Sequence, residues 1–289
     1  MKKILALVLA LSCVLALAAC GSSAPAPAAT PAPAAEAPAD EPANEPVTVR
    51  IGLTGAVYEP IWDVVKEKLA PEGINLEYVQ FNNFSLPNNA LNNGEIEINA
   101  FQHHAFFNND TASTGYNLTA IGDTYIVAMD IFSDKITDLK DLKDGDLVAV
   151  PNDVTNEGRA LKLLESAGII EIDPAAGNSP TINDITDYKI QVQFQEVDAN
   201  LVPSILPDVT IAVVNGNYAL DAGLQAENAL FKESEYADNS YYCLIAVRSE
   251  DAENPVYQRI VEAYQCDEVI DVYNSQFAGF FTPTWKLEG

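Results

Sequence analysis

The sequence predicts an α/β protein with two lobes, and three observations support this prediction. Between residues 47 and 289, alternating or β-branched runs take turns with runs whose apolar residues recur at helical spacing. The connections between successive runs are short, as in βαβ units, where helices cover a parallel sheet. This rhythm occurs twice, and the chain then returns to the first set. Two such sets predict two lobes with a ligand cleft between them, at the carboxyl ends of the strands.

The first set begins at Val47 and alternates between strands and helices. Its opening strand is rich in β-branched residues, and the helix that follows has Pro60 in its first turn, where a backbone N–H is not needed. The second helix is short and is closed by Gly94. In order, the predicted elements are strand 47–53, helix 59–70, strand 75–81, helix 87–94 and strand 95–101.

The second set has the same pattern and is followed by the returning segment. Its helix is amphipathic and is stopped by Gly168. Its strands are apolar runs bounded by turn residues. The predicted elements are strand 146–153, helix 156–168, strands 190–197 and 209–216, and then the returning strand 241–249 and helix 254–266.

The first nineteen residues have the features of a signal peptide. Two lysines follow Met1, and residues 4–19 then carry no charge, a run too short to span a bilayer comfortably. Residues 17–21, LAACG, resemble the bacterial lipobox. We therefore expect residues 1–19 to be removed and Cys20 to receive a diacylglycerol and become the N-terminus. An ordinary signal peptide that happens to contain a cysteine is the alternative.

The segment after Cys20 is a tether rather than part of a fold. Residues 21–46 consist almost entirely of alanine, proline, glutamate and serine. Alternating proline favours extended polyproline II and prevents regular hydrogen-bonded structure. We expect residues 20–46 to hold the folded body off the extracytoplasmic face of a cell membrane, to which the lipid anchors it.

The charge of the chain excludes several kinds of partner. Fifteen lysine and arginine residues stand against 42 aspartate and glutamate residues, which gives a formal net charge of −27. A nucleic-acid-binding protein needs cations to displace the counterions of phosphate, and this chain has few. The same scarcity argues against attachment to anionic lipid through a basic segment.

Few residue patterns point to catalysis or to a metal. The sequence has none of the GxSxG, HExxH, P-loop or GxGxxG patterns, so we expect neither an enzyme nor a cofactor. His103 and His104 are the two histidines of the chain, and neighbours on a strand point to opposite sides, which makes a metal-binding lipoprotein a weaker alternative. Cys243 and Cys266 form a disulfide or stay as two buried thiols, and the sequence leaves both open.

Four segments, residues 81–107, 148–170, 213–224 and 254–264, resemble the NlpA/MetQ family of lipoproteins, the substrate-binding proteins of methionine ABC importers. The phrases PND-x-x-NEGRAL and N-x-FQHH carry the resemblance. It implies a type II periplasmic-binding-protein fold, with residues 47–130 and 230–289 in lobe I and residues 131–229 in lobe II. It also implies an amino-acid ligand, methionine first, and an ABC permease and ATPase as partners. A binding protein for another amino acid or small ligand is the alternative.

Arg159 is the main candidate for holding the ligand. The chain has four arginines, and this one falls in the first turns of a helix, where a guanidinium can meet a carboxylate with two parallel hydrogen bonds. From the residues alone, a salt bridge with Glu157 or another nearby acid is an equal alternative. The resemblance implies ligand contact for Arg159. It implies the same for Asn156, at or near the N-cap of this helix, and for Asn215, which ends a buried strand and is favoured over Asn217.

The resemblance also implies a pocket for the ligand side chain. Sulfur of a thioether packs favourably on aromatic rings, which suits methionine. Without the resemblance, an aromatic cluster is more often part of a core. Relatives commonly have tyrosine where this chain has phenylalanine at positions 84 and 106, and His104 is assigned no role. The pocket residues are Phe84, Phe101, His103 and Phe106.

Overall fold

The computed structural model describes residues 45–287, apart from residues 235, 237 and 278. The predicted signal peptide, the acylated Cys20 and nearly all of the tether therefore lie outside the described residues. Within the described part, no helix is both long enough and apolar enough to cross a membrane. The two cysteines in this part, Cys243 and Cys266, are free thiols.

The first sheet has the strand order β2-β1-β3-β12-β4. Strand β1 pairs in parallel with β2 and β3, as predicted, whereas the returning strand β12 is antiparallel to both β3 and β4. The third strand is much shorter than the predicted 95–101, and just before its start the Arg50 N–H donates to the side chain of Glu97, at 2.7 Å, rather than to a backbone carbonyl. The strands are β1 (Val47–Thr54), β2 (Ile74–Phe81), β3 (Ile98–Asn99), β4 (Leu118–Asp123) and β12 (Leu244–Arg248).

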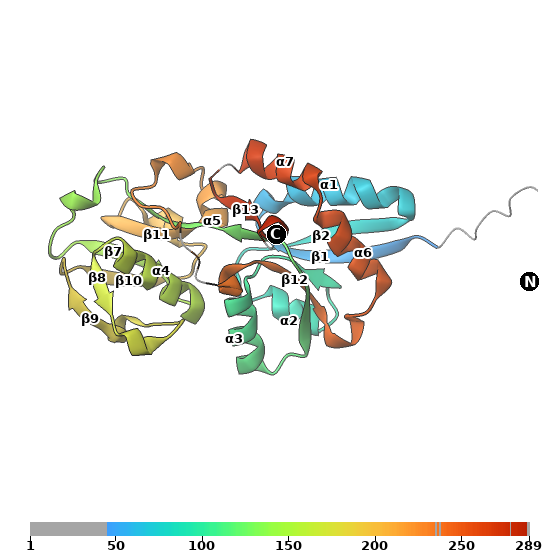
Figure 1. The fold of residues 1–289 in the computed structure, drawn as a ribbon, viewed down its shortest axis with the longest axis horizontal. Coiled ribbons are helices and arrows are strands. Elements are labelled where there is room, and N and C mark those ends of the chain that lie inside the picture. The colour runs from blue at the N-terminus through green and yellow to red at the C-terminus, as the bar shows by residue number, and fades with distance from the viewer. Residues whose placement is uncertain (1–44, 235, 237, 278, 288–289) are drawn as a thin grey trace, which may run out of the picture. The chain divides into compact units, whose positions relative to one another are not determined.

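Helices cover both faces of this sheet (Figure 1). Side chains alternate along β12, so that Leu244 packs with α2 and α3 residues while Ile245 belongs to the core under α1 and α6. Burying one large apolar side chain such as Ile245 stabilises the fold by about 1.5–3 kcal/mol. The helices of this half are α1 (Glu59–Leu69), α2 (Pro87–Asn92), α3 (His104–Thr114), α6 (Pro255–Tyr264) and α7 (Asp267–Gln276).

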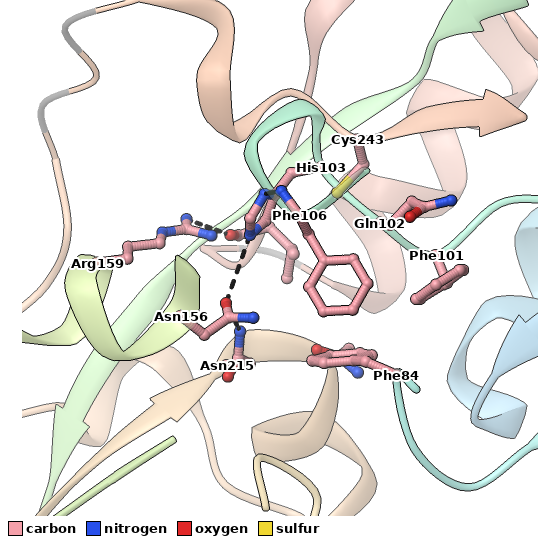
Figure 2. A pocket seen from close by; sticks show the side chains of 11 residues that line it. Phe84, Phe101, Gln102, His103, Phe106, Asn156, Arg159, Asn215 and Cys243 are labelled. Atoms are coloured by element: carbon pink, nitrogen blue, oxygen red, sulfur yellow. Dashed lines mark hydrogen bonds between the residues drawn. The ribbon is translucent and has the colours of Figure 1, made fainter. Parts of the chain in front are cut away.

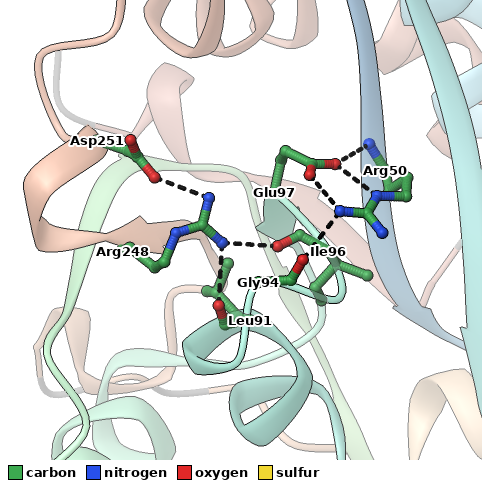
Figure 3. Close-up of polar contacts among 7 residues, drawn as sticks. All are labelled: Arg50, Leu91, Gly94, Ile96, Glu97, Arg248 and Asp251. Atoms are coloured by element: carbon green, nitrogen blue, oxygen red, sulfur yellow. Dashed lines mark hydrogen bonds and ion pairs between the residues drawn. The ribbon is translucent and has the colours of Figure 1, made fainter.

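Two arginines fasten the turn between α2 and β3 (Figure 3). Arg248 donates from Nη1 to the carbonyl oxygens of Leu91 and Ile96, at 3.1 and 2.9 Å. Arg50 donates from Nη2 to the carbonyl of Gly94 at 3.0 Å and pairs with Glu97. These hydrogen bonds connect the end of α2 and the turn that follows it to β1 and β12.

The second sheet has the strand order β10-β7-β11-β6. Strands β10, β7 and β11 are parallel, and β6 runs antiparallel to β11. Helix α4 (Val154–Ser166) covers one face of this sheet, and α5 (Gly216–Asp221) follows β11 directly. The strands are β6 (Met129–Phe132), β7 (Leu147–Pro151), β10 (Gln193–Val197) and β11 (Ile211–Asn215). The lobe boundaries derived from the resemblance stay a prediction.

Smaller elements complete the fold and include several that the sequence analysis did not predict. Strand β5 (Tyr125–Val127) pairs with β13 (Phe281–Pro283), and β8 (Ile170–Ile172) pairs with β9 (Ile185–Tyr188). Helix α3 was missed because its sequence, HAFFNNDTAST, places no apolar stripe at helical spacing.

The start of α4 differs from the prediction. The helix begins at Val154, and its N-cap is Asp153 rather than Asn156. The Asp153 carboxylate accepts from the backbone N–H of Asn156 at 3.0 Å, which places Asn156 inside the first turn. Gly158 is required here because a Cβ would lie 2.7 Å from the Cα of Ser179.

Candidate functional site

A cavity lies where α3, α4 and α5 begin (Figure 2). Its walls come from segments that follow β3, β7 and β11, which belong to both sheets. The structure brings all seven predicted ligand-binding residues together here, and their contact with a ligand stays a prediction. The lining residues are Phe84, Phe101, Gln102, His103, Phe106, Val127, Asn156, Arg159, Asn215, Asn217 and Cys243.

The Arg159 side chain is 1% exposed and is held by Glu233, whose side chain is 8% exposed. Its Nε donates to Glu233 Oε1 at 2.8 Å, and its Nη2 donates to Glu233 Oε2 at 2.5 Å and to the Val127 carbonyl at 2.8 Å. The ring of Tyr241 lies 4.4 Å from the guanidinium carbon, a cation–π distance. Burial alone would lower the pKa of Arg159, but the charge of Glu233 outweighs it and raises that pKa, so the guanidinium stays charged.

This arrangement changes what Arg159 can offer a ligand. The two parallel hydrogen bonds expected for a ligand carboxylate are made to Glu233 instead. Neither Glu157 nor an acid on a neighbouring turn is this partner, since Glu157 accepts from the Ile182 N–H at 3.2 Å. Arg159 Nη1 makes no hydrogen bond to another described residue, and Arg159 is one of the residues that line the cavity.

Glu233 is a site residue that the sequence analysis missed. Its segment pairs with the edge of β6, where the Ile131 N–H donates to the carbonyl of Phe231 at 2.9 Å. The Met129 N–H donates to Glu233 Oε2 at 3.0 Å, and the Glu233 N–H donates to Asp130 Oδ1 at 3.0 Å. In a chain with 42 acidic residues, no sequence signal distinguishes this glutamate.

A chain of side-chain hydrogen bonds connects Asp153 with the cavity. Asn156 donates from Nδ2 to both carboxylate oxygens of Asp153, at 3.0 Å each. Its Oδ1 accepts from Asn215 Nδ2 at 2.8 Å and lies 3.4 Å from His103 Nε2. The oxygen of Asn156 therefore points toward both neighbours, as Figure 2 shows.

His103 caps α3 and is neutral. Its Nδ1 accepts from the backbone N–H of Phe106 at 3.1 Å, so the ring proton is on Nε2, which faces Asn156. Burial, with the charge of Arg159 as the next cause, lowers the pKa of His103 to about 3. At neutral pH the ring is therefore a hydrogen-bond donor without charge.

Two amide atoms in the wall of the cavity have no hydrogen-bond partner among the described residues. They are the acceptor Asn215 Oδ1 and the donor Asn217 Nδ2, on residues that are 4% and 1% exposed. A buried polar atom without a partner costs about 1–3 kcal/mol, so such atoms are favourable contacts for a polar ligand. Asn217, a weaker candidate than Asn215 from the sequence, lines the same cavity.

Three phenylalanines form the apolar wall of the cavity. The ring centroids of Phe84 and Phe101 are 5.9 Å apart, and Phe106 lies edge-on at 6.0 Å from Phe84 and 5.9 Å from Phe101. These separations are typical of aromatic clusters. The cluster borders the cavity rather than filling the interior of a core, and it suits an apolar side chain.

The described residues show no arrangement suited to a metal. In residues 45–287, as far as they are described, no group of three or more histidine, cysteine, aspartate and glutamate side chains could hold an ion. The two histidines have separate partners, since His104 Nε2 contacts Asp123 Oδ1 at 2.7 Å while His103 faces Asn156.

Comparison with known proteins gives consistent results. A family model described as NlpA lipoprotein matches residues 49–285. The D-methionine-binding lipoprotein MetQ of Escherichia coli O157:H7 is 36% identical over 248 residues, which cover 85% of this chain and 90% of the relative. A solved structure of a nutrient-binding protein from Burkholderia cenocepacia, bound to methionine, has a TM-score of 0.78 at 37% identity and covers 81% of this chain and 99% of that one. The substrate-binding protein of a methionine transporter from Streptococcus pneumoniae has a TM-score of 0.78 at 33% identity, with coverages of 82% and 95%.

These matches confirm the predicted fold class. The similar structures are substrate-binding proteins with the two-lobed periplasmic-binding-protein fold, and the two sheets of this chain correspond to it. The family match covers residues 49–285, so it includes every residue that lines the cavity. The chain belongs to the NlpA lipoprotein family.

Proposed function

We propose that this protein binds methionine in the cavity and delivers it to an ABC importer. The observation that carries the proposal is the composition of the cavity wall. A charged, buried guanidinium and two unpartnered amide atoms supply contacts for an amino-acid head group, and three phenylalanines supply contacts for an apolar side chain.

The head group has complementary partners. Arg159 Nη1 carries two N–H groups for the ligand carboxylate, and Asn217 Nδ2 is a second donor in the same wall. Asn215 Oδ1 accepts a hydrogen bond from the ligand ammonium. Each of these atoms lacks a partner among the described residues, so the ligand would complete hydrogen bonds that the fold leaves unmade.

The charge balance of the site favours a zwitterion. Glu233 already neutralises Arg159, and His103 is uncharged at neutral pH. A ligand with one positive and one negative group adds no net charge to this buried environment, whereas a simple carboxylic acid adds an uncompensated anion.

The side-chain pocket suits a thioether. Contacts between sulfur and an aromatic ring contribute about 0.3–1.5 kcal/mol each, and Phe84, Phe101 and Phe106 offer three rings. Relatives with this fold are named for methionine binding, which supports the same ligand here.

Delivery requires a membrane anchor and a partner that recognises the bound form. The anchor would be the acylated Cys20 with residues 21–46 as the tether, on the extracytoplasmic face. A ligand can stabilise one arrangement of the two lobes only if it binds that arrangement better than others. The loaded protein would then dock on the permease, and the ATPase would drive transport.

The test is a binding panel with a matched pair of variants. Calorimetry with the twenty amino acids, in both enantiomers where they exist, should give the strongest binding with methionine. Arg159→Lys keeps the charge beside Glu233 but removes Nη1, and a lost charge-assisted bond weakens binding about ten- to a hundredfold. Arg50→Lys changes the same residue type far from the cavity and should leave the affinity unchanged.

Two results would count against the proposal. If the protein binds a different amino acid tightly and does not bind methionine, the identification of methionine as the ligand is wrong. If the Arg159→Lys and wild-type proteins bind methionine with equal affinity, Arg159 does not contact the ligand. The anchor is tested separately by cell fractionation, in which Cys20→Ser should move the protein from the membrane fraction to the soluble fraction.

A further inference from the structure

The side-chain amides of Asn156 and Asn215 belong to a chain of hydrogen bonds that begins at Asp153. Asp153 does not line the cavity that contains Arg159. An ionised carboxylate only accepts hydrogen bonds, so Asn156 must present its Nδ2 to Asp153, at 3.0 Å from each oxygen. The Oδ1 of Asn156 consequently faces the other way, toward the cavity wall.

The orientation of Asn156 determines the orientation of the Asn215 amide. Because Asn156 Oδ1 is an acceptor, Asn215 must donate to it from Nδ2, at 2.8 Å. The remaining atom of that amide, Asn215 Oδ1, is then directed away from Asn156, and it is buried without a partner among the described residues. If Asn156 turned over, Asn215 would turn too and would present an N–H donor in place of the carbonyl oxygen.

His103 supports the same assignment independently. The backbone N–H of Phe106 fixes Nδ1 as the acceptor, so Nε2 carries the proton. That proton requires an acceptor opposite it, and Asn156 Oδ1 lies there at 3.4 Å. The reversed orientation of Asn156 would place two donors against each other.

We propose that Asp153 is a positioning residue that sets the hydrogen-bonding polarity of the ligand site. Through Asn156 it makes Asn215 present a carbonyl oxygen to the ligand, and this oxygen selects ligands that carry an ammonium group. The proposal rests on the proposed function, because it assigns the head group of an amino-acid ligand. Asp153 would then have two separate roles, as the N-cap of α4 and as a determinant of ligand selectivity.

The experiment measures discrimination between two ligands. Methionine is compared with 4-(methylsulfanyl)butanoate, which has the same carboxylate and thioether but no amino group. In Asp153→Asn, an amide can still cap α4, but one of its two groups is now a donor facing Asn156 Nδ2, and only His103 still favours the present orientation of Asn156. Calorimetry gives the affinity for methionine divided by the affinity for 4-(methylsulfanyl)butanoate. In Asp153→Asn this ratio should fall about tenfold or more, mainly because methionine binds more weakly.

Two further variants separate selectivity from stability. Asp153→Ser keeps a good N-cap and removes both carboxylate contacts to the side chain of Asn156, so it should lower the ratio as well. Asn254→Ser changes the N-cap of α6, which is remote from the cavity, and should leave the ratio unchanged. Denaturation of each variant confirms that it is folded.

The outcomes distinguish this proposal from the proposed function. If wild-type protein binds methionine but Asp153→Asn weakens both ligands by the same factor, or neither, Asp153 is only a helix cap and the inference is wrong. If wild-type protein binds a different amino acid, the choice of methionine is wrong. The ratio is then measured with that amino acid and its counterpart lacking the amino group, and the same criterion applies.

Discussion

Arg50 and Arg159 make the same set of hydrogen bonds in two different environments. Each donates from Nε and Nη2 to the two oxygens of one glutamate, and each donates again from Nη2 to a backbone carbonyl. The Arg50 and Glu97 side chains are 39% and 20% exposed, whereas those of Arg159 and Glu233 are 1% and 8% exposed.

The comparison shows that hydrogen-bond geometry alone does not define a binding site. At Arg50, solvent screens the pair, and the pair fastens a turn of the first sheet. At Arg159, the same pattern is desolvated, so removal of either partner leaves an uncompensated buried charge. Of the two arginines, Arg159 is the one that lines the cavity.

The largest expected effect is on stability when the buried cation is removed. Arg159→Met leaves Glu233 buried without its partner, and loss of one member of a buried pair costs about 3–5 kcal/mol. Arg50→Met should cost less than about 1 kcal/mol, because its pair is solvated. Urea denaturation of the two variants measures both free energies of unfolding.

A second substitution sharpens this result. In Arg159→Met/Glu233→Leu neither charge is buried alone, so much of the lost stability should return. The equivalent pair of changes at Arg50 and Glu97 should be nearly additive. Similar losses for Arg159→Met and Arg50→Met would show that burial does not separate the two pairs.

Asp130 should make the buried site respond to pH. It is fully buried, and burial raises its pKa to about 6 from 3.8, so folding takes up a proton between these pH values. The ionised carboxylate therefore lowers stability above about pH 6, by about 3 kcal/mol for a shift of this size. Asp130→Asn keeps an oxygen for the Glu233 N–H and should be more stable than wild type at pH 8.

This difference should disappear as the pH falls below about 4, where Asp130 is protonated in both folded and unfolded chains. Thermal unfolding of both proteins across this range provides the measurement. A constant difference at every pH would mean that Asp130 is not ionised in the fold at pH 8.

The sequence predicted elements whose local pattern agrees with their place in the fold. Strand β1, helix α1 and strand β11 follow their predicted ranges closely, because alternation or helical spacing matches the face that each one buries. Helix α3 and the antiparallel direction of β12 depend on contacts between distant segments, which no local pattern contains.

The candidate site follows the same division. Arg159 could be selected because arginine is scarce in this chain, and Asn215 because it ends a buried strand. Asp153 precedes a helix as a typical N-cap and could have been found by that signal, but Asn156 is also a good N-cap. Glu233 and the orientation of the Asn215 amide depend on tertiary contacts, so they required the structure.

The smallest expected effect is at the exposed pair, where the pH response should have the opposite sign. Burial alone would raise the pKa of Glu97, but the hydrogen bonds and charge of Arg50 outweigh it and lower that pKa. A lowered carboxyl pKa contributes stability above its unfolded value of 4.5, and this contribution is lost as the pH falls through the folded value.

Glu97→Gln should therefore lose stability at neutral pH, and the loss should fade in acid, whereas Asp130→Asn gains at high pH. Because Arg50 is partly solvated, the loss should stay below about 1 kcal/mol and shrink further in 0.5 M salt. Urea denaturation at pH 7, with and without salt, measures it. A loss as large as that of Arg159→Met, unaffected by salt, would show that the exposed pair is as strongly desolvated in solution as the pair at the cavity.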